Sequence, residues 1–320
     1  MSNDGKPGVL VTDPRVMSLA RPLAGQFDVI DAGDADALAD KAGEVIAIVA
    51  AGVDRIDAAL LDRLPKLWLI AAAATGIDGI DTAAAAARGV TVTNAGSLHA
   101  NDVADYAVVM TLAARQQVML ADQWVRDGRW PDEPMMKPRT SLASERVGIV
   151  GMGAIGSAVA RKISAFCPDI GWWAPRAQDL PWPRHDSLID LARWSSILIL
   201  CARGDPALTG MISTEVIDAI GPEGLFMNIA RGFLVDEDAL IDALKAGRLG
   251  QAALDVFAVE PAQSARWRDV PNVLLSPHSA GITIETGAAR LEVITGNVQA
   301  ILTGGQLQNI VVDGRASNPA

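Results

Sequence analysis

Residues 146–163 read RVGIVGMGAIGSAVARKI: an apolar stretch, then three glycines at the start of a run with helical periodicity. The spacing is G-x-G-x-x-G at the junction of a predicted strand and a predicted helix. In such a loop the first glycine permits a tight turn, the second lets the backbone approach a pyrophosphate, and the third lets helix and strand pack closely. Glycines that merely close a βα turn are the alternative, but the flanking strand and helix favour a dinucleotide site with phosphates at the helix N-terminus. The residues expected to contact the cofactor here are Gly151, Gly153, Ala154, Ile155 and Gly156.

Length and composition are those of a globular protein. At ~150 residues per domain, the 320 residues suggest about two domains. Half of the residues are hydrophobic and the mean hydropathy is +0.24, which excludes an intrinsically disordered chain. The net charge of −11 disfavours binding to nucleic acid or to anionic membranes. Cys167 and Cys201 lack the spacing of a zinc site or a disulfide framework, and no apolar run approaches the ~20 residues of a membrane span. We therefore expect a cytoplasmic protein with no metal, nucleic-acid or membrane partner.

Short apolar runs alternate with helical stretches on both sides of the glycine loop, which is the rhythm of βαβ units and a parallel sheet. Strands are predicted at 9–11, 45–49, 67–72, 90–92, 146–150, 170–173, 196–201, 225–229, 251–256 and 273–275. One long helix is predicted over 101–119 and another over 284–302, and Asp236 and Gly247 mark the start and end of a third. The Pro-rich stretch 128–144 is predicted to be a linker or a functional arm.

The residues after the predicted strand 170–173 bear on the choice between NAD and NADP. In NAD sites an acidic residue about 20 positions beyond the glycine loop binds the ribose. Ala174 occupies that region and Arg176 follows it, so a 2′-phosphate would meet a cation and no carboxylate. This favours NADP(H), with NAD(H) as the alternative if Arg176 is an ordinary surface cation.

Several ordered motifs together give a resemblance that covers nearly the whole chain. They are Ala74-Thr-Gly-Ile-Asp-Gly-Ile-Asp81, Gly89-Val-Thr-Val-Thr-Asn94, Asp102-Val-Ala-Asp105, the glycine loop, Asn228-Ile-Ala-Arg231-Gly232, Leu254-Asp255-Val-Phe-Ala-Val-Glu260-Pro261 and Ser276-Pro277-His278-Ser-Ala-Gly281. With them the chain resembles the D-isomer-specific 2-hydroxyacid dehydrogenases, and within that family the glyoxylate/hydroxypyruvate reductases, including the hydroxyphenylpyruvate reductase type.

The resemblance implies an α/β fold of two Rossmann-like, doubly wound parallel-sheet domains, with the cofactor domain inserted into the substrate domain. Mapped on this sequence, residues 1–96 and 282–320 would form the substrate-binding domain and residues 97–281 the dinucleotide-binding domain. The resemblance also implies a homodimer.

The same resemblance implies the roles of the site residues. His278 would donate the proton to the substrate carbonyl, Glu260 would orient and stabilise its imidazolium, and Arg231 would bind the substrate carboxylate. Backbone N–H groups of Thr75 and Gly76 would form a second carboxylate clamp. Asp255 would orient the nicotinamide carboxamide, and Ile229 would also contact the cofactor.

The activity implied is reduction of small 2-oxo acids, glyoxylate or hydroxypyruvate, to D-2-hydroxy acids by hydride transfer from NAD(P)H. One alternative is a dehydrogenase of larger D-2-hydroxy acids, of the phosphoglycerate or hydroxyphenyl-lactate type. Another is a nucleotide-sensing binding protein similar to the C-terminal binding protein corepressors. This alternative is disfavoured because the sequence shows no extra segments for recruiting partners.

Overall fold

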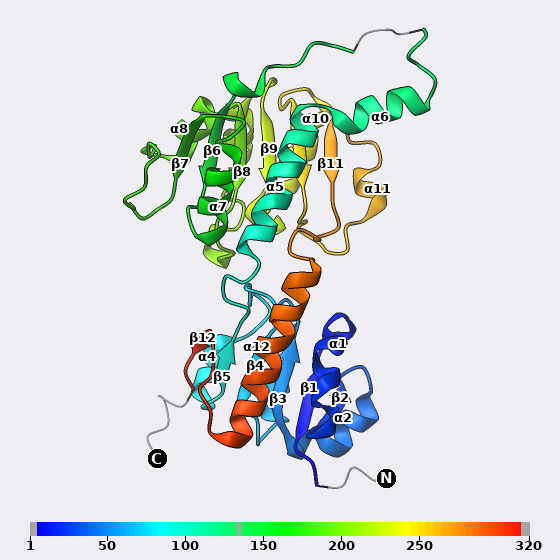
Figure 1. The fold of residues 1–320 in the computed structure, drawn as a ribbon, viewed down its shortest axis with the longest axis vertical. Coiled ribbons are helices and arrows are strands. Elements are labelled where there is room, and N and C mark those ends of the chain that lie inside the picture. The colour runs from blue at the N-terminus through cyan, green and yellow to red at the C-terminus, as the bar shows by residue number, and fades with distance from the viewer. Residues whose placement is uncertain (1–4, 133–135, 315–320) are drawn as a thin grey trace. The chain divides into compact units, whose positions relative to one another are not determined.

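The computed structural model describes residues 5–132 and 136–314, which form two compact α/β units (Figure 1). One unit consists of the chain up to His99 together with the chain from Thr283 onward, and the other is Ala100–Ile282. The second unit is therefore inserted into the first. The expected fold class is confirmed.

The first unit contains a six-stranded sheet in the order β12-β5-β4-β3-β1-β2. Its strands are β1 (Gly8–Val11), β2 (Asp28–Asp31), β3 (Val45–Ala50), β4 (Leu69–Ala72), β5 (Thr91–Thr93) and β12 (Ile310–Val312). All neighbours pair in parallel except β12, which is antiparallel to β5. Every residue of β1 and β4 is buried, as expected where helices cover both faces of a parallel sheet.

Three helices of the first unit, each after a strand, begin at carboxylate caps. The side chains of Asp34, Asp57 and Asp81 accept hydrogen bonds from first-turn amides. The helices are α1 (Met17–Ala20), α2 (Ala35–Lys41), α3 (Ala58–Asp62), α4 (Thr82–Ala87) and α12 (Ile284–Thr303), with short 3₁₀ turns η1 (Pro14–Val16), η2 (Arg21–Gly25) and η3 (Ala42–Glu44).

The second unit contains six parallel strands in the order β11-β10-β9-β8-β6-β7. They are β6 (Arg146–Val150), β7 (Asp169–Trp173), β8 (Ile197–Leu200), β9 (Leu225–Asn228), β10 (Gln251–Leu254) and β11 (Val273–Leu275). The chain runs from β6 to β7 on one side and returns to β8 on the other. The order thus reverses between β6 and β8, and ligands bind at such a switch point in open α/β sheets.

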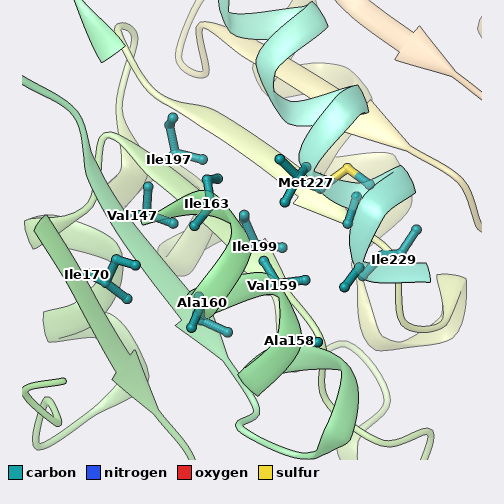
Figure 2. Close-up of a cluster of buried hydrophobic side chains, with 14 of the residues drawn as sticks. Val147, Ala158, Val159, Ala160, Ile163, Ile170, Ile197, Ile199, Met227 and Ile229 are labelled. Atoms are coloured by element: carbon teal, nitrogen blue, oxygen red, sulfur yellow. The ribbon is translucent and has the colours of Figure 1, made fainter. Parts of the chain in front are cut away.

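The helices of the second unit are α5 (Ala100–Arg115), α6 (Val118–Arg126), α7 (Ala154–Ile163), α8 (Leu188–Trp194), α9 (Thr214–Ile220), α10 (Glu237–Lys245) and α11 (Ser264–Trp267), with 3₁₀ turns η4 (Leu142–Ser144), η5 (Pro206–Leu208) and η6 (Gly232–Leu234). Helices α5 and α7 lie side by side on one face of the sheet (Figure 1). Figure 2 shows Val159 and Ile163 of α7 close to apolar side chains of the strands such as Ile199, and all three residues are fully buried. This packing fixes the helix whose N-terminus follows the glycine loop.

The prediction of one helix over 101–119 is wrong. Helix α5 ends at Arg115, Gln117 adopts the left-handed conformation with φ 52°, and α6 begins at Val118. Helix α5 buries Val103, Ala107 and Met110, whereas α6 buries no residue, so the packing that holds the helix straight stops at the break. In Figure 1, α6 continues from the end of α5 away from the sheet of its unit.

The other predicted elements are present, with ends that differ by a few residues, and β2 and β12 were not predicted. The helix predicted at 284–302 is confirmed as α12. Asp236 caps α10 through a bond from the Ala239 amide, and Gly247 follows the helix with φ 69°. None of the described helices is long and apolar enough to cross a membrane, and the described residues contain no cluster of metal-ligating side chains.

Candidate active site

The glycine loop has the backbone geometry of a phosphate cradle. Gly151 has φ 92°, and a Cβ atom there would lie 2.7 Å from Cα of Ala202, at the end of β8. A Cβ atom on Gly156 would collide with the carbonyl oxygen of Gly151. At Gly153, by contrast, no described atom lies within 4 Å of the Cβ position. The loop is therefore closed against the sheet at its two ends and open at its centre, which fits the pyrophosphate of a dinucleotide.

Helix α7 presents its N-terminus to this opening. Gly153 is the residue before its first turn, Gly153 and Ala154 are exposed, and Ile155 is half-buried. The first N–H groups of a helix have no partner within it and attract anions. The first turn contains no acidic side chain to compete with a phosphate.

A cation that was not predicted, Arg184, lies beside the end of β7. Ala174 is buried and Arg176 is exposed in the turn that follows. Arg184 pairs with Trp172 in an isolated parallel bridge beside β7, and its Nη2 donates to the carbonyl oxygen of Ala174 at 3.0 Å. Its guanidinium lies 5.8 Å from the centre of the Trp172 ring. No local motif marks Arg184, because the bridge depends on pairing across a loop.

His278 and Glu260 form the central pair of the site. Nδ1 of the histidine lies 2.7 Å from Oε2 of the glutamate, and the amide of Phe257 donates to Oε1 at 3.1 Å. Burial alone would raise the pKa of Glu260. The hydrogen bond from His278, the charge of its imidazolium, the Phe257 amide and the charge of Arg231 outweigh burial and lower this pKa below its usual value. The imidazole is still 42% exposed, so its Nε2 edge can reach a ligand.

Arg231 reaches the same neighbourhood from the turn after β9. The buried side chain of Asn228 shapes that turn: its Nδ2 donates to the carbonyl oxygen of Arg231 at 3.0 Å, and its Oδ1 accepts from the Ala230 amide at 3.0 Å. A Cβ atom on Gly232 would collide with the backbone of Phe257, so this glycine permits close approach to the segment that leads to Glu260. The structure thus brings Arg231, Glu260 and His278 together.

Asp255 supports the loop that carries His278. Its carboxylate is buried and accepts from the amides of Ser279 at 2.9 Å and Ala280 at 3.1 Å. Its carbonyl oxygen accepts from the amide of His278 at 2.8 Å. The expected contact with the nicotinamide would be an additional role for this carboxylate. Ile229, between Asn228 and Ala230, is also buried.

Thr75 and Gly76 belong to the other unit, where they follow β4. The Thr75 hydroxyl donates to the carbonyl oxygen of Gly96 and lies 3.2 Å from Nε2 of His99. The side chain of Asn94 donates to the Thr75 carbonyl at 2.7 Å. The hydroxyl of Thr75 is thus engaged within its own unit. The expected carboxylate clamp would use the backbone amide of this residue.

Tyr106 on α5 is a second residue that sequence reasoning missed. Its hydroxyl lies 2.7 Å from Oγ of Ser276, two residues before His278. The only signal in the sequence is that Tyr106 is the single tyrosine of the chain.

Comparison with known proteins identifies the family of the chain. The family model for the D-isomer specific 2-hydroxyacid dehydrogenase, NAD binding domain, matches residues 108–280. The hydroxyphenylpyruvate reductase of Plectranthus scutellarioides is 36% identical over 310 residues, 95% of this chain and 99% of that protein. A glyoxylate/hydroxypyruvate reductase A of Arabidopsis thaliana is 35% identical over 257 residues, 80% of this chain and 82% of that protein.

Solved structures give the same result over nearly the full length. A 2-hydroxyacid dehydrogenase from Ketogulonicigenium vulgare superposes with a TM-score of 0.88 at 36% identity, covering 97% of this chain and 99% of that one. An NADPH-dependent glyoxylate/hydroxypyruvate reductase from Sinorhizobium meliloti, in complex with NADP and malonate, has a TM-score of 0.88 at 31% identity, covering 99% and 100%. The chain therefore belongs to the D-isomer specific 2-hydroxyacid dehydrogenase family of NAD(P)-dependent oxidoreductases.

Proposed function

We propose that the protein reduces small 2-oxo acids of the glyoxylate and hydroxypyruvate type to D-2-hydroxy acids, with NADPH as the preferred reductant. The observation that carries the proposal is the 2.7 Å contact between His278 Nδ1 and Glu260 Oε2, beside Arg231 and with the imidazole still exposed. This arrangement supplies a proton donor and a carboxylate-binding cation at one place. The reductases among the relatives support the same substrate class.

In this proposal His278 donates a proton from Nε2 to the carbonyl oxygen of the substrate as negative charge develops there. Glu260 holds the ring through Nδ1 and stabilises the imidazolium before the transfer. Arg231 binds the substrate carboxylate with its planar guanidinium and polarises the carbonyl. The family resemblance assigns the second carboxylate contact to the amides of Thr75 and Gly76. A bound nicotinamide would supply the hydride.

The cofactor would lie along the glycine loop, with its phosphates on the amides at the start of α7. Asp255 and Ile229 would line the nicotinamide end, and Ala174 and Arg176 the adenosine end. The proposed preference for NADPH rests on the exposed Arg176 and on the uncharged Ala174, because a 2′-phosphate needs a cation and tolerates no nearby carboxylate. Titration calorimetry with NADP⁺ and NAD⁺ tests the preference. We expect Arg176→Ala to weaken NADP⁺ binding and to leave NAD⁺ binding unchanged, and an unchanged ratio would exclude Arg176 from this role.

We also propose that the protein is a homodimer and that α6 lies in the interface. Helix α6 buries no residue within its own chain, and it exposes Val118, Met119 and Val125. A hollow lined by Ala121, Trp124, Val125, Trp130 and Met136 lies beside these side chains. An apolar surface of this kind on an amphipathic helix favours a protein partner, and a second copy is the simplest one. Light scattering after size exclusion should give a dimer that Val125→Asp dissociates.

A cytoplasmic location is part of the same proposal. Both Cys167 and Cys201 are free thiols, which is usual in a reducing compartment. Fractionation of the source cells tests it.

The decisive experiment is a panel of 2-oxo acids assayed by the loss of NADPH absorbance. The panel holds glyoxylate, hydroxypyruvate, hydroxyphenylpyruvate and phosphohydroxypyruvate, so that its larger members report the alternative substrate class. We expect the highest kcat/KM with the two smallest acids, and at least ~100-fold loss of kcat in His278→Gln, the usual effect of removing a positioned acid. A panel without turnover, or full activity in His278→Gln, would overturn the proposal.

A further inference from the structure

Three hydroxyl groups form a closed cluster around the segment that carries His278. The hydroxyl of Tyr106 lies 2.7 Å from Oγ of Ser276, and Oγ of Ser279 donates to the tyrosine oxygen at 3.1 Å. The two serine oxygens lie 2.9 Å apart. Ser276 is buried, and Tyr106 and Ser279 are partly buried. The serines stand two residues before and one residue after His278, so the cluster brackets it.

The backbone of His278 needs such support. Its φ of 52° lies in the left-handed region, which costs free energy for any residue with a side chain. From the β10 side, Asp255 accepts the amides of His278, Ser279 and Ala280, and Leu254 accepts the amide of Ser276. Those bonds fix the backbone of the segment. The side chains of the two serines are tied instead to α5, through one tyrosine hydroxyl.

From this geometry we infer that Tyr106 is a positioning residue for the proton donor. Its hydroxyl acts through Ser276 and Ser279 to hold the imidazole of His278 at hydrogen-bond distance from Glu260. The inference rests on the proposed role of His278. Helix α5 packs against both β10 and β11. It therefore gives the hydroxyl a rigid base next to the segment that follows β11 and carries His278. Two hydroxyl contacts to flanking residues limit rotation of the strained segment, which a contact at one end would not do.

The ring and the hydroxyl of Tyr106 have separable effects. The ring packs against the hydrophobic core of the second unit, whereas the oxygen makes the serine contacts. Tyr106→Phe keeps the ring and removes only the oxygen. We expect its Tm to stay within a few degrees of the wild type, because a single hydrogen bond contributes little to the stability of a large domain.

The test is single-turnover reduction of glyoxylate by Tyr106→Phe, with steady-state KM values and cofactor affinity measured alongside. We expect the single-turnover rate and kcat to fall about fivefold or more, since misplacement of an acid group affects the transition state. The KM for NADPH and the Kd for NADP⁺ should not change.

Thr111→Val is the matched control. Thr111 lies on the same helix and is fully buried, and its hydroxyl bonds only the carbonyl of Ala107 among the contacts described. This variant should keep the wild-type rate.

A double-mutant cycle distinguishes action through the serines from a local effect. If Tyr106 acts through Ser276, then Tyr106→Phe combined with Ser276→Ala loses little more activity than the more damaging single variant. Ser279→Thr, which keeps the hydroxyl, should retain more activity than Ser279→Ala. Both serine variants also report on the cluster if Tyr106→Phe does not fold.

The inference is overturned if Tyr106→Phe and Ser279→Ala turn over within twofold of the wild type, or if the losses in the cycle add fully. It is also overturned if the variants change KM and Tm and leave the single-turnover rate intact, since that pattern belongs to a structural role. His278→Gln separates this failure from failure of the proposed function. If that variant keeps its activity, His278 is not the donor. If it loses activity while Tyr106→Phe does not, only the positioning role of Tyr106 is excluded.

Discussion

The imidazole of His278 and the carboxylate of Glu260 meet at 2.7 Å although separate bonds hold each of them. Glu260 is fixed by the amide of Phe257, and the backbone of His278 is fixed by Asp255. The histidine keeps 42% of its side chain exposed and the glutamate 31%. The pair is thus formed in the second unit alone, at an accessible edge.

The first prediction concerns Glu260→Gln, which keeps the shape of the side chain and removes its charge. Without the carboxylate the imidazolium loses its stabilising partner, so reductive kcat should fall ~10–100-fold near neutral pH. Steady-state assays at saturating NADPH and glyoxylate measure the loss. Glu44→Gln, a change to an exposed carboxylate paired with Lys66 in the other unit, should leave kcat unchanged. A kcat for Glu260→Gln equal to that of the wild type would contradict the assignment.

A second prediction follows from the lowered pKa of Glu260. A carboxyl group whose pKa is lower in the folded state stabilises the fold above its unfolded pKa of ~4.3, and this stabilisation is lost as pH falls through the folded value. The free energy of unfolding of the wild type should therefore exceed that of Glu260→Gln more at pH 6 than at pH 3.5. Urea denaturation at the two pH values measures the difference. A gap that widens toward acid would mean that the pKa is raised.

Local patterns were enough to predict an α/β fold and a dinucleotide loop, whereas the inserted domain and the candidate site residues came from the resemblance carried by the ordered motifs. The glycines at 151, 153 and 156 report three backbone requirements within one turn, and each is met in the structure. Arg231, Glu260 and His278 each follow a strand of one parallel sheet, and the carboxyl ends of such strands share an edge. In the sequence, however, the three residues were assigned together through the motifs that carry the family resemblance.

The features that were missed depend on contacts between distant segments. Tyr106 and Ser276 are separated by 170 positions, and nothing near either residue indicates that they meet. Arg184 reaches Ala174 only because a loop returns to pair beside β7. The break at Gln117 was missed because apolar periodicity continues across it, while the core against which α5 packs does not. Apolar periodicity shows that a helix has an apolar face, but it does not show whether another element covers that face.

The third prediction contrasts two glycines of the same loop. Gly153 has an ordinary φ of −74° and open space at its Cβ position, so Gly153→Ala should fold normally with an unchanged Tm. Its methyl group would occupy the space where a pyrophosphate approaches, and NADP⁺ and NAD⁺ should both bind at least ~10-fold more weakly. Gly156→Ala places a methyl group against the carbonyl of Gly151 and should lower the Tm as well. Calorimetry of binding and thermal unfolding separate the two. Equal cofactor affinity in Gly153→Ala would show that the cofactor does not pass over this residue.

The fourth prediction concerns Arg231→Lys, which keeps the charge and loses the planar fork. A lysine cannot make the bidentate contact to a carboxylate, so the KM for glyoxylate should rise and kcat should fall, each by ~10-fold or more. The Kd for NADP⁺ should stay constant, because Arg231 is assigned to the substrate. Oxalate, a carboxylate inhibitor without a reducible ketone, should lose affinity in parallel. Unchanged oxalate inhibition would place the carboxylate elsewhere.

The last prediction concerns a buried ion pair that joins α5 to the start of β6. Nε and Nη2 of Arg115 donate to the two carboxylate oxygens of Glu145 at 2.6 and 3.1 Å, and Oγ of Ser196 donates to one of them at 2.5 Å. The glutamate side chain is 1% exposed, so Arg115→Ala would leave a buried carboxylate without its cation and should cost ~3–5 kcal/mol in free energy of unfolding. Lys66→Ala, which breaks the exposed pair with Glu44, should cost no more than about 1 kcal/mol. Replacing both Arg115 and Glu145 by methionine should recover part of the loss, since the double change leaves no unpaired charge. Chemical denaturation of the four proteins gives the comparison, and a cost for Arg115→Ala as small as that for Lys66→Ala would show that Glu145 finds another partner.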